Sequence, residues 1–269
     1  MAIHTIARHA RQGVTVVVES TVAVGMTREL LSSLAATQKA KVGMSPERVD
    51  PGRKFPAFRK ITKIISGIDP RSLEAVHQLY GRMFDHLIPV SSLEAAEMTK
   101  LYENGQRMVC AAYANEMADA CTSLNIDGWE VSRAAASKPF GYLPFWPEPG
   151  IRGPCIPVNP CYLPRTCNMP ILQHTTEISW RRPSEIVGRL MRDIEDKWGM
   201  TGAQPLLSGS TIRIFIVGVG FKKGQTVLDN SPGVAAIQCL LREYNVDVEF
   251  ADPLVDQAAL TCVPKLDTA

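Results

Sequence analysis

The chain has 269 residues and a net charge of +2; 45% of its residues are hydrophobic and 21% are charged. This composition is typical of a globular protein with a sizeable core, and the length predicts about two domains. There is no dense basic run and no apolar stretch near the roughly 20 residues that span a bilayer. Nothing in the composition therefore indicates binding to nucleic acid or to a membrane.

The cysteines and the amino terminus predict a cytoplasmic protein with free thiols. There are seven cysteines, an odd number, without a C-x-x-C pair, and residues 1–13 lack the apolar core of a signal peptide. Cys155, Cys161 and Cys167 recur every six residues. That spacing matches no common zinc-binding pattern, so we expect no metal site.

Residues 1–90 alternate short apolar runs with amphipathic stretches. The pattern predicts a helix at the start, helices at 27–36 and 70–84, and strands at 14–20, 41–44, 63–67 and 86–91. Strands that alternate with helices favour a parallel α/β sheet. A doubly wound domain normally opens on a strand and a glycine-rich turn. No G-x-G-x-x-G precedes residue 90, so only part of such a domain is expected.

Residues 91–200 read as helical. An uninterrupted pattern over 92–125 predicts a helix longer than a usual domain helix, which suits a spine between lobes or a dimer element. Asp127 is placed to cap a shorter helix after it. A loop rich in proline and glycine follows at 145–160. Two further helical pieces are expected, separated at Pro183.

Residues 199–210 read as a polar linker, and the rest of the chain as one βαβ unit. The expected elements are a strand that ends in glycines, a helix and a second strand, at 211–224, 231–244 and 247–253. A single βαβ unit is too small to bury its own faces. The last domain is therefore expected to be partial as well.

Three groups of polar residues are candidates for chemistry. On the long helix, Glu97, Lys100, Asn104 and Arg107 fall within an arc of about 80°. They form either a solvated stripe or the polar face of a cleft. Thr21 follows one strand, and Glu47 and Arg48 follow the next, at one expected sheet edge where open α/β sheets bind ligands; an ordinary polar strand end is the alternative. The glycines of "GVGFKKG" suit either a phosphate or a tight turn.

Together these stretches resemble the UDP-glucose/GDP-mannose dehydrogenase family of nucleotide-sugar 6-dehydrogenases. The motifs occur in the family's order: "ESTVAVG", "SPERVDPG", "AAEMTKLYEN", "IDGWEVSRAAASKPFG", "CIPVNP", "GFKKG" and "NSPG". "CIPV" and "SPERVDPG" resemble the branch that acts on UDP-N-acetylhexosamines, such as UDP-N-acetylglucosamine and UDP-N-acetylmannosamine. The resemblance implies an α/β fold, truncated at both ends. Its expected parts are a remnant of the NAD-binding Rossmann-like domain (1–90), an all-α dimerisation domain with the spine helix (91–200) and a partial Rossmann-like UDP-binding domain (210–269).

The resemblance also implies an activity and the residues that carry it. Family members use NAD to oxidise the sugar C6 hydroxyl to a carboxylate in two steps, through a thiohemiacetal and a thioester on a loop cysteine. The expected catalytic residues are Cys155 as nucleophile, Lys100 and Asn104 beside the oxyanion, Thr21 and Glu47 around a water and the NAD, and Asn159. The expected substrate contacts are Arg48, Arg107, Gly150, Gly153 and Lys222.

Several positions depart from the family pattern. Asn159 stands where the family has an acid, and it cannot take up a proton. Glu148, Arg152 and Pro154 stand where the family has glycines and a histidine, so side chains enter space that the glycines leave open. Near the carboxyl terminus, Val227 and Asp229 replace an aspartate and an arginine.

Two functions follow from these matches and departures. The first is an NAD-dependent UDP-sugar 6-dehydrogenase of polysaccharide precursor synthesis, of which this chain is a fragment or a divergent form. The second is a non-catalytic partner. It would form a homodimer through residues 92–125, or a heterodimer with a full-length homologue.

Overall fold

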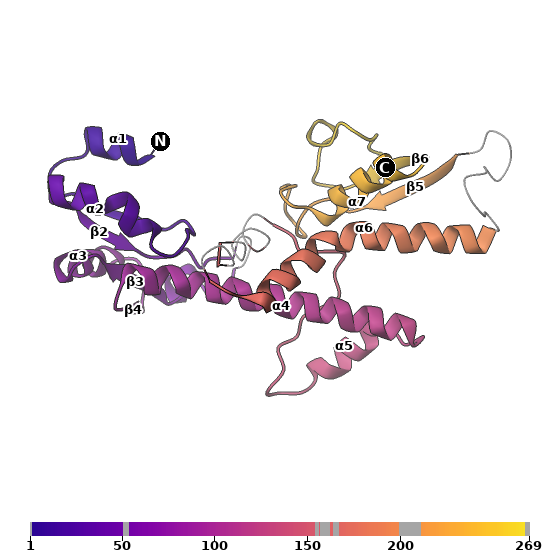
Figure 1. The fold of residues 1–269 in the computed structure, drawn as a ribbon, viewed down its shortest axis with the longest axis horizontal. Helices are drawn as coiled ribbons and strands as arrows, with labels where there is room; N and C mark the ends of the chain where they lie inside the picture. The colour runs from indigo at the N-terminus through magenta and orange to yellow at the C-terminus, as the bar shows by residue number, and fades with distance from the viewer. Residues whose placement is uncertain are drawn as a thin grey trace. The chain divides into compact units, whose positions relative to one another are not determined.

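The computed structural model describes residues 2–50, 54–153, 156, 162–163, 167–198 and 211–266 (Figure 1). The chain divides into two compact units. Unit 1 comprises residues 1–105 with 162–168, and unit 2 comprises 106–161 with 169–269. The division falls within the long helix α4 (Leu93–Ser123). The three domains expected at 1–90, 91–200 and 210–269 stay a prediction.

Unit 1 holds a four-stranded sheet in the order β1-β2-β3-β4. The strands are β1 (Thr15–Val18), β2 (Lys41–Met44), β3 (Lys63–Gly67) and β4 (Leu87–Pro89). The helices are α1 (Ala2–His9), α2 (Met26–Gln38) and α3 (Pro70–Tyr80), with a 3₁₀ turn at Phe58–Lys60. The predicted alternation of strands and helices, and with it the α/β fold class, is confirmed.

The expectation of a wholly parallel sheet is wrong at one pairing. β1 pairs with β2 in parallel, and β3 with β4 in parallel, but β2 and β3 run antiparallel. A parallel pairing needs a crossover connection, usually a helix. The described residues between β2 and β3 contain only the 3₁₀ turn Phe58–Lys60, so the chain returns beside β2 in the opposite direction.

Two glycines let α3 pack closely on the β2–β3 pair. Gly43 and Gly67 are register partners in the antiparallel ladder. A Cβ on Gly43 would lie 2.5 Å from Cγ2 of Val76, and one on Gly67 would lie 2.2 Å from the backbone nitrogen of Leu73. Neither position can carry a side chain at this spacing. The close approach buries Val76 fully in a cluster with Ile65 and Tyr80.

Unit 2 contains helices α5 (Gly128–Ala136) and α6 (Pro170–Trp198) together with the later part of α4. Asp127 caps α5 as predicted, since its carboxylate accepts the Trp129 N–H at 2.8 Å. The predicted break at Pro183 is wrong, because α6 is continuous through it. A proline removes one helical hydrogen bond and bends a helix without ending it when tertiary packing holds both halves. Figure 1 shows such a bend within α6.

The carboxyl-terminal part is the predicted βαβ unit. β5 (Ile212–Val217) and β6 (Val246–Ala251) pair in parallel and are joined by α7 (Pro232–Glu243). Val187 and Met191 of α6 belong to the same apolar core as Ile237, Leu240 and Phe250. Helix α6 thus supplies the apolar surface that a βαβ unit alone lacks.

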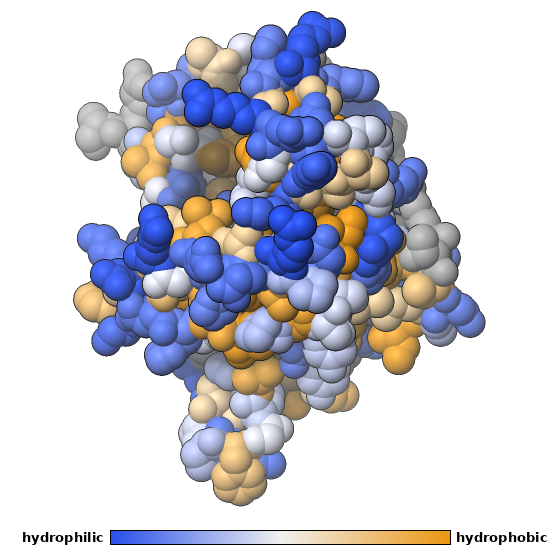
Figure 2. Space-filling view, turned by 90° about the vertical axis from the view of Figure 1, so that its left-hand side faces the viewer, coloured by the Kyte–Doolittle hydropathy of each residue, from blue (hydrophilic) through white to orange (hydrophobic). Residues whose placement is uncertain are grey.

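The surface of the molecule on the side of α1, α2 and α3 is mostly hydrophilic, with small groups of apolar residues between the polar ones (Figure 2). Isolated apolar side chains of this kind are normal for a globular protein. In the part of the chain that the structure describes, no helix combines the length and the apolar character needed to cross a membrane.

Candidate functional site

The carboxyl ends of β1 and β2 bring two groups of predicted site residues together. The parallel pairing aligns Val18 with Met44, and the ladder continues beyond the strands with a hydrogen bond of 3.0 Å from Glu47 N–H to the Glu19 carbonyl. Thr21 is half-buried two residues beyond Glu19, while Glu47 is exposed. The prediction that Thr21 and Glu47 lie at one edge of the sheet is confirmed.

Arg48 links this edge to helix α4. Its guanidinium forms an ion pair of 2.7 Å with Glu103 and donates a second bond of 2.7 Å to the Thr62 carbonyl. Glu103 directly precedes Asn104 on α4. The contact therefore fixes the end of β2 beside the part of α4 that carries Lys100 and Asn104.

The polar stripe of α4 is not uniformly solvated. Glu97 is fully buried, Asn104 is 5% exposed, Lys100 is half-buried and Arg107 is exposed. Among the described residues, the side-chain nitrogen of Asn104 has no hydrogen-bond partner. A buried amide without a partner costs free energy unless a ligand or a water completes it. The stripe therefore contains one buried donor group without a partner among the described residues.

Glu97 has a structural role that the sequence did not reveal. Its carboxylate accepts the Gly25 N–H at 2.6 Å and the Thr27 N–H at 2.8 Å. These amides open α2, whose N-cap residue Gly25 has no side chain to cap them. Glu97 thus caps a helix some 70 residues earlier in the chain, and its negative charge suits the positive end of the helix dipole.

A cluster of the buried Lys63 and Tyr80 with the more exposed Glu19 lies at the same sheet edge and was also missed. The ammonium of Lys63 lies 3.0 Å from the Glu19 carboxylate, and the Tyr80 hydroxyl donates to the same oxygen at 2.6 Å. Burial raises the pKa of Glu19, but the bonds from Tyr80 and Lys63 outweigh it and hold this pKa below its usual value. Burial, together with Glu19, raises the pKa of Tyr80.

In unit 2, the loop that leads to Cys155 is fixed to two helices. The backbone N–H of Glu148 donates to Oδ1 of Asn115 on α4 at 2.7 Å. The backbone carbonyl of Glu148 accepts a bond from Nε of Arg182 on α6 at 2.8 Å. Arg182 also forms a bidentate pair with Asp119, at 2.7 and 3.1 Å. Asn115 and Arg182 are buried, so these bonds are shielded from water.

The two side chains that depart from the family's glycines contact each other. Arg152 forms an ion pair with Glu148, which lies four residues earlier in the chain. Burial raises the pKa of Glu148, although Arg152 and Arg107 oppose this. The space that glycines would leave open is thus occupied by a pair whose charges balance locally.

The protein's own structure constrains Gly150 and Gly153. A Cβ on Gly150 would lie 3.1 Å from Pro183 and 3.3 Å from Pro232. Gly153 has a φ of +93°, and its carbonyl accepts Nδ2 of Asn230 at 3.1 Å. Their predicted contact with substrate stays a prediction.

Lys222 lies in a turn after β5 that an acidic residue organises. Asp252 accepts the Val219 and Gly220 N–H groups on one oxygen and those of Leu254 and Val255 on the other. Burial raises the pKa of Asp252, but these four backbone bonds outweigh it and lower the pKa below its usual value. Asp252 was not predicted, because its partners span two loops.

The predicted site residues fall into two groups by unit. Thr21, Glu47, Arg48, Lys100 and Asn104 belong to unit 1, and Arg107, Gly150, Gly153 and Lys222 belong to unit 2. Cys155 and Asn159 lie outside the described residues. Within the described ranges, no three His, Cys, Asp or Glu side chains are grouped to hold a metal ion.

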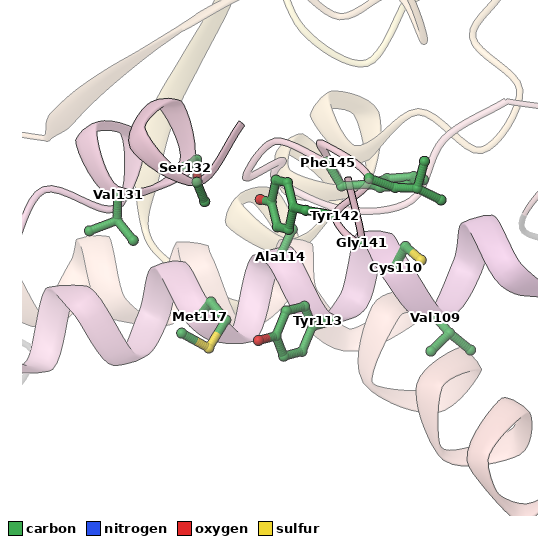
Figure 3. A pocket seen from close by; sticks show the side chains of 12 residues that line it. Val109, Cys110, Tyr113, Ala114, Met117, Val131, Ser132, Gly141, Tyr142 and Phe145 are labelled. Carbon is green, nitrogen blue, oxygen red and sulfur yellow. The ribbon is translucent and has the colours of Figure 1, made fainter. Parts of the chain in front are cut away.

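A cavity of about 650 Å³ lies on unit 2 between α4, α5 and residues 141–145 (Figure 3). Cys110, Tyr113 and Met117 of α4 line one side, and Val131 of α5 and Tyr142 line the other. Tyr113 and Leu143 are each 60% exposed. The volume suits a small ligand or the side chains of a partner, and the lining is largely apolar.

The sequence matches two models of one family. Residues 1–84 match the NAD binding domain of the UDP-glucose/GDP-mannose dehydrogenase family, and residues 94–179 match its central domain. The UDP-N-acetyl-D-mannosamine dehydrogenase of Salmonella typhi is 28% identical over all of this chain and 67% of its own length. The UDP-N-acetyl-D-glucosamine 6-dehydrogenase of Salmonella typhi is 31% identical over 95% of this chain and 60% of its own length.

Solved structures agree with the sequence matches. A UDP-D-ManNAc dehydrogenase from Pyrococcus horikoshii superposes with a TM-score of 0.84 at 25% identity, covering 95% of this chain and 60% of that one. The UDP-N-acetyl-mannosamine dehydrogenase of Staphylococcus aureus gives 0.78 at 26% identity, covering 95% and 59%. The chain thus spans roughly three fifths of these relatives. On its sequence and its fold, the chain belongs to the UDP-glucose/GDP-mannose dehydrogenase family.

Proposed function

We propose that this chain carries the catalytic residues of an NAD-dependent nucleotide-sugar 6-dehydrogenase, and that the substrate is a UDP-N-acetylhexosamine. The observation that carries the proposal is that Thr21, Glu47, Lys100 and Asn104 belong to one compact unit, in which Arg48, next to Glu47, pairs with Glu103, next to Asn104. The names of the relatives support the same substrate class. A cytoplasmic location, where nucleotide sugars are made, belongs to this proposal.

The residues at the ends of β1 and β2 fit a nicotinamide cofactor. Ligands of open α/β sheets bind at the carboxyl ends of the strands, where Thr21 and Glu47 lie, and the buried nitrogen of Asn104 needs a partner. NAD, when bound, accepts the hydride that each of the two oxidations removes from C6 of the sugar. Thr21 and Glu47 would hold it together with the water that takes the hydroxyl proton.

The protein's own residues supply the covalent chemistry. Between the two oxidations the thiolate of Cys155 adds to the aldehyde carbon, which forms a C–S bond. After the second oxidation, water attacks the thioester, the C–S bond breaks, and the carboxylate and the free thiol result. The ammonium of Lys100 and the amide of Asn104 stabilise the oxyanion at each addition. Asn159 can hydrogen-bond the attacking water but cannot take its proton.

Basic side chains and loop backbone would bind the substrate. Arg48 and Arg107 supply positive charge for the diphosphate. Lys222, in the turn that Asp252 holds, and the backbone at Gly150 and Gly153 would contact the UDP part.

The test measures NADH formed per UDP-N-acetylhexosamine consumed, by absorbance and by product analysis. Two NADH per sugar acid are expected, and Cys155→Ser should abolish acid formation. Lys100→Met should lower kcat about 100-fold, since removing one oxyanion donor costs that much. Lys197→Met, at an exposed position on α6, is the matched control. The assignment is wrong if Cys155→Ser still gives two NADH per sugar.

The cavity on α4 and α5 favours a second function, that of a dimerisation partner. Exposed apolar residues surround it, and apolar patches of this kind mark protein interfaces. Tyr113, Leu143 and Trp129 are 60%, 60% and 48% exposed, and Trp129 stacks on Trp146 at 6.1 Å. A second copy of the chain, or a full-length homologue, would cover this surface.

The oligomeric state tests this second function. Light scattering should give a molar mass twice that of one chain. The Met117→Lys variant should have the molar mass of a single chain. Leu30→Lys, at an apolar exposed position on α2, should leave the dimer intact. A chain that is monomeric alone but co-elutes with a full-length homologue indicates the heterodimer. A monomer under both conditions rules out the partner role.

A further inference from the structure

A polar groove of about 510 Å³ lies on unit 2, apart from the residues proposed for catalysis. Helix α6 forms one side, and the end of α7 and Asp119 of α4 form the other. Its lining residues are Asp119, Arg181, Ser184, Glu185, Gly188, Arg189, Arg192, Glu243 and Tyr244. The groove is therefore a polar depression with three arginines.

Most of the carboxylates in the groove are already paired. Asp119 is shared by Arg182 at 2.7 Å and Arg189 at 2.8 Å. Glu243 pairs with Arg242 at 2.6 Å. In the part of the chain that the structure describes, neither Arg181 nor Arg192 forms an ion pair, and both are exposed. With Glu185 as the one unpaired acid in the lining, the groove keeps an excess of positive charge.

Helix geometry directs the two unpaired arginines to one surface. Positions 181, 188 and 192 lie within about 40° of one another around the helix axis, so they form a line along α6. The central position is Gly188, which has no side chain. A Cβ there would lie 3.5 Å from Nη1 of Arg192 and 3.8 Å from the hydroxyl of Tyr244. A guanidinium and a phenol thus converge on an open patch of helix.

We propose that this groove binds the phosphate group of a small phosphorylated metabolite. Guanidinium groups bind phosphate oxygens through two parallel N–H bonds, and a tyrosine hydroxyl adds a third donor. Arg192 and Tyr244 hold the phosphate above Gly188, and Arg181 approaches from one side. The volume leaves room for a ligand of sugar-phosphate size. Glycine lowers the stability of a helix relative to alanine, and here it keeps the floor of the groove open.

A chain of ion pairs and hydrogen bonds connects the groove to the loop beside Cys155. Arg189 lines the groove and shares Asp119 with Arg182, and Arg182 holds the Glu148 carbonyl. A phosphate that draws Arg189 toward the groove weakens one of the two contacts of Asp119. Phosphate binding thereby changes the contacts that hold residues 148–153.

The test is a calorimetric titration of the full chain with inorganic phosphate and, separately, with glucose 6-phosphate. We expect saturable binding of both compounds. Glucose 6-phosphate should bind more tightly than inorganic phosphate if the physiological ligand is an organic phosphate, and both should bind equally if that ligand is free phosphate. The double variant Arg181→Gln/Arg192→Gln should weaken binding at least tenfold. Arg71→Gln, at an exposed arginine of α3 in unit 1, should leave it unchanged. Both substituted positions are exposed, and circular dichroism checks that the variants fold.

Saturating UDP separates this groove from the proposed substrate site. Phosphate binding should persist in its presence, and hydrogen exchange should slow at 184–192 and 242–244. Three results would each overturn the proposal. They are displacement of phosphate by UDP, equal affinity in the double variant, and no saturable binding up to about 10 mM, a weak affinity for a metabolite. None of these outcomes depends on catalytic activity, so the dehydrogenase assignment can fail while the groove stands.

Discussion

Two glutamates of α4, three positions apart, contact α2 in different environments. Glu94 pairs with Arg28 at 2.6 Å on the surface, where its side chain is 31% exposed. Glu97 is fully buried and accepts two backbone N–H groups. Exposed ion pairs contribute little because water screens them, whereas a buried cap cannot be removed without orphaning its donors. The two side chains should therefore differ greatly in their effect on stability.

Glu97→Ala should lower the free energy of unfolding by about 3 kcal/mol. The change leaves the half-buried Gly25 N–H and the buried Thr27 N–H without an acceptor, and a buried group of this kind costs about 1–3 kcal/mol. Urea unfolding followed by circular dichroism measures it. Glu116→Ala, at an exposed position on the same helix, should cost less than about 0.5 kcal/mol. Equal losses in the two variants would contradict the capping role.

Glu94→Gln should have a small effect that depends on pH. The hydrogen bond from Arg28 lowers the pKa of Glu94 from 4.5 to about 2. Because the folded pKa is depressed, the stabilisation is present above pH 4.5 and is lost as the pH falls toward 2. At pH 7 the loss should be less than about 1 kcal/mol, since the pair is exposed.

A double-mutant cycle isolates this pair. In an Arg28→Gln background, Glu94→Gln should cost nothing at any pH between 3 and 7. A pH-dependent difference that persists without Arg28 would mean that another group holds the Glu94 carboxylate.

Residue types and their order along the chain predicted part of this site. The adjacency of Thr21 and Glu47 followed from two consecutive parallel strands, because their carboxyl ends must meet. The cap supplied by Glu97 could not be predicted, since Gly25 and Thr27 carry no local signal of a partner 70 residues away. The Lys63–Glu19–Tyr80 cluster was hidden for the same reason. Residue types reveal local chemistry, but only the fold pairs distant side chains.

At the scale of elements, the closest packing is that of α3 on the β2–β3 pair. Gly67→Ala should lower the free energy of unfolding by about 3 kcal/mol or more, the upper range for overpacking. Its Cβ would meet the Leu73 backbone at 2.2 Å, and a backbone cannot rotate away as a side chain can. Thermal and urea unfolding measure the change.

Gly188→Ala is the matched control for this substitution. Its Cβ meets only ordinary contacts of 3.5 and 3.8 Å, so the variant should be as stable as the parent or more so. If Gly67→Ala proves equally benign, α3 does not pack as closely as described.

Element boundaries were predicted well where local signals are strong. Asp127 as a cap, the strands at 41–44 and 63–67, and the helix at the start of the chain all match the structure. The prediction at Pro183 was wrong because proline usually ends a helix, whereas α6 continues through it and the adjacent Arg182 bonds the Glu148 carbonyl and Asp119. The sequence predicts no helix between β2 and β3. Because a parallel pairing needs a crossover connection, usually a helix, the missing helical pattern indicates an antiparallel pairing.

At the scale of the whole molecule, the two units should respond to different ligands. NAD should slow hydrogen exchange at 18–25 and 44–48 of unit 1, because the ends of β1 and β2 are its expected site. UDP should slow exchange at 218–225 of unit 2, around Lys222. Mass spectrometry of peptides after exchange measures both. Protection of 218–225 by NAD, or of 18–25 by UDP, would contradict the assignment of the two nucleotide sites.

The motif order along the chain predicted the family, and the fold agrees with it. The division into units within α4 was not predicted, because a continuous helical pattern gives no sign of where packing partners change. That change depends on contacts made by residues far from α4 in sequence.

The burial of Lys63 makes it a natural reporter of how unit 1 opens. Among the lysines that the structure describes, it alone is buried, with its ammonium 5.1 Å from the centre of the Tyr80 ring. An amine-acylating reagent would label the other described lysines in the native protein and reach Lys63 only in molecules that have unfolded there. The ratio of labelled Lys63 to labelled Lys39 would thus count openings of unit 1 in a mixture, even inside cells, where no spectroscopic signal separates this protein from others.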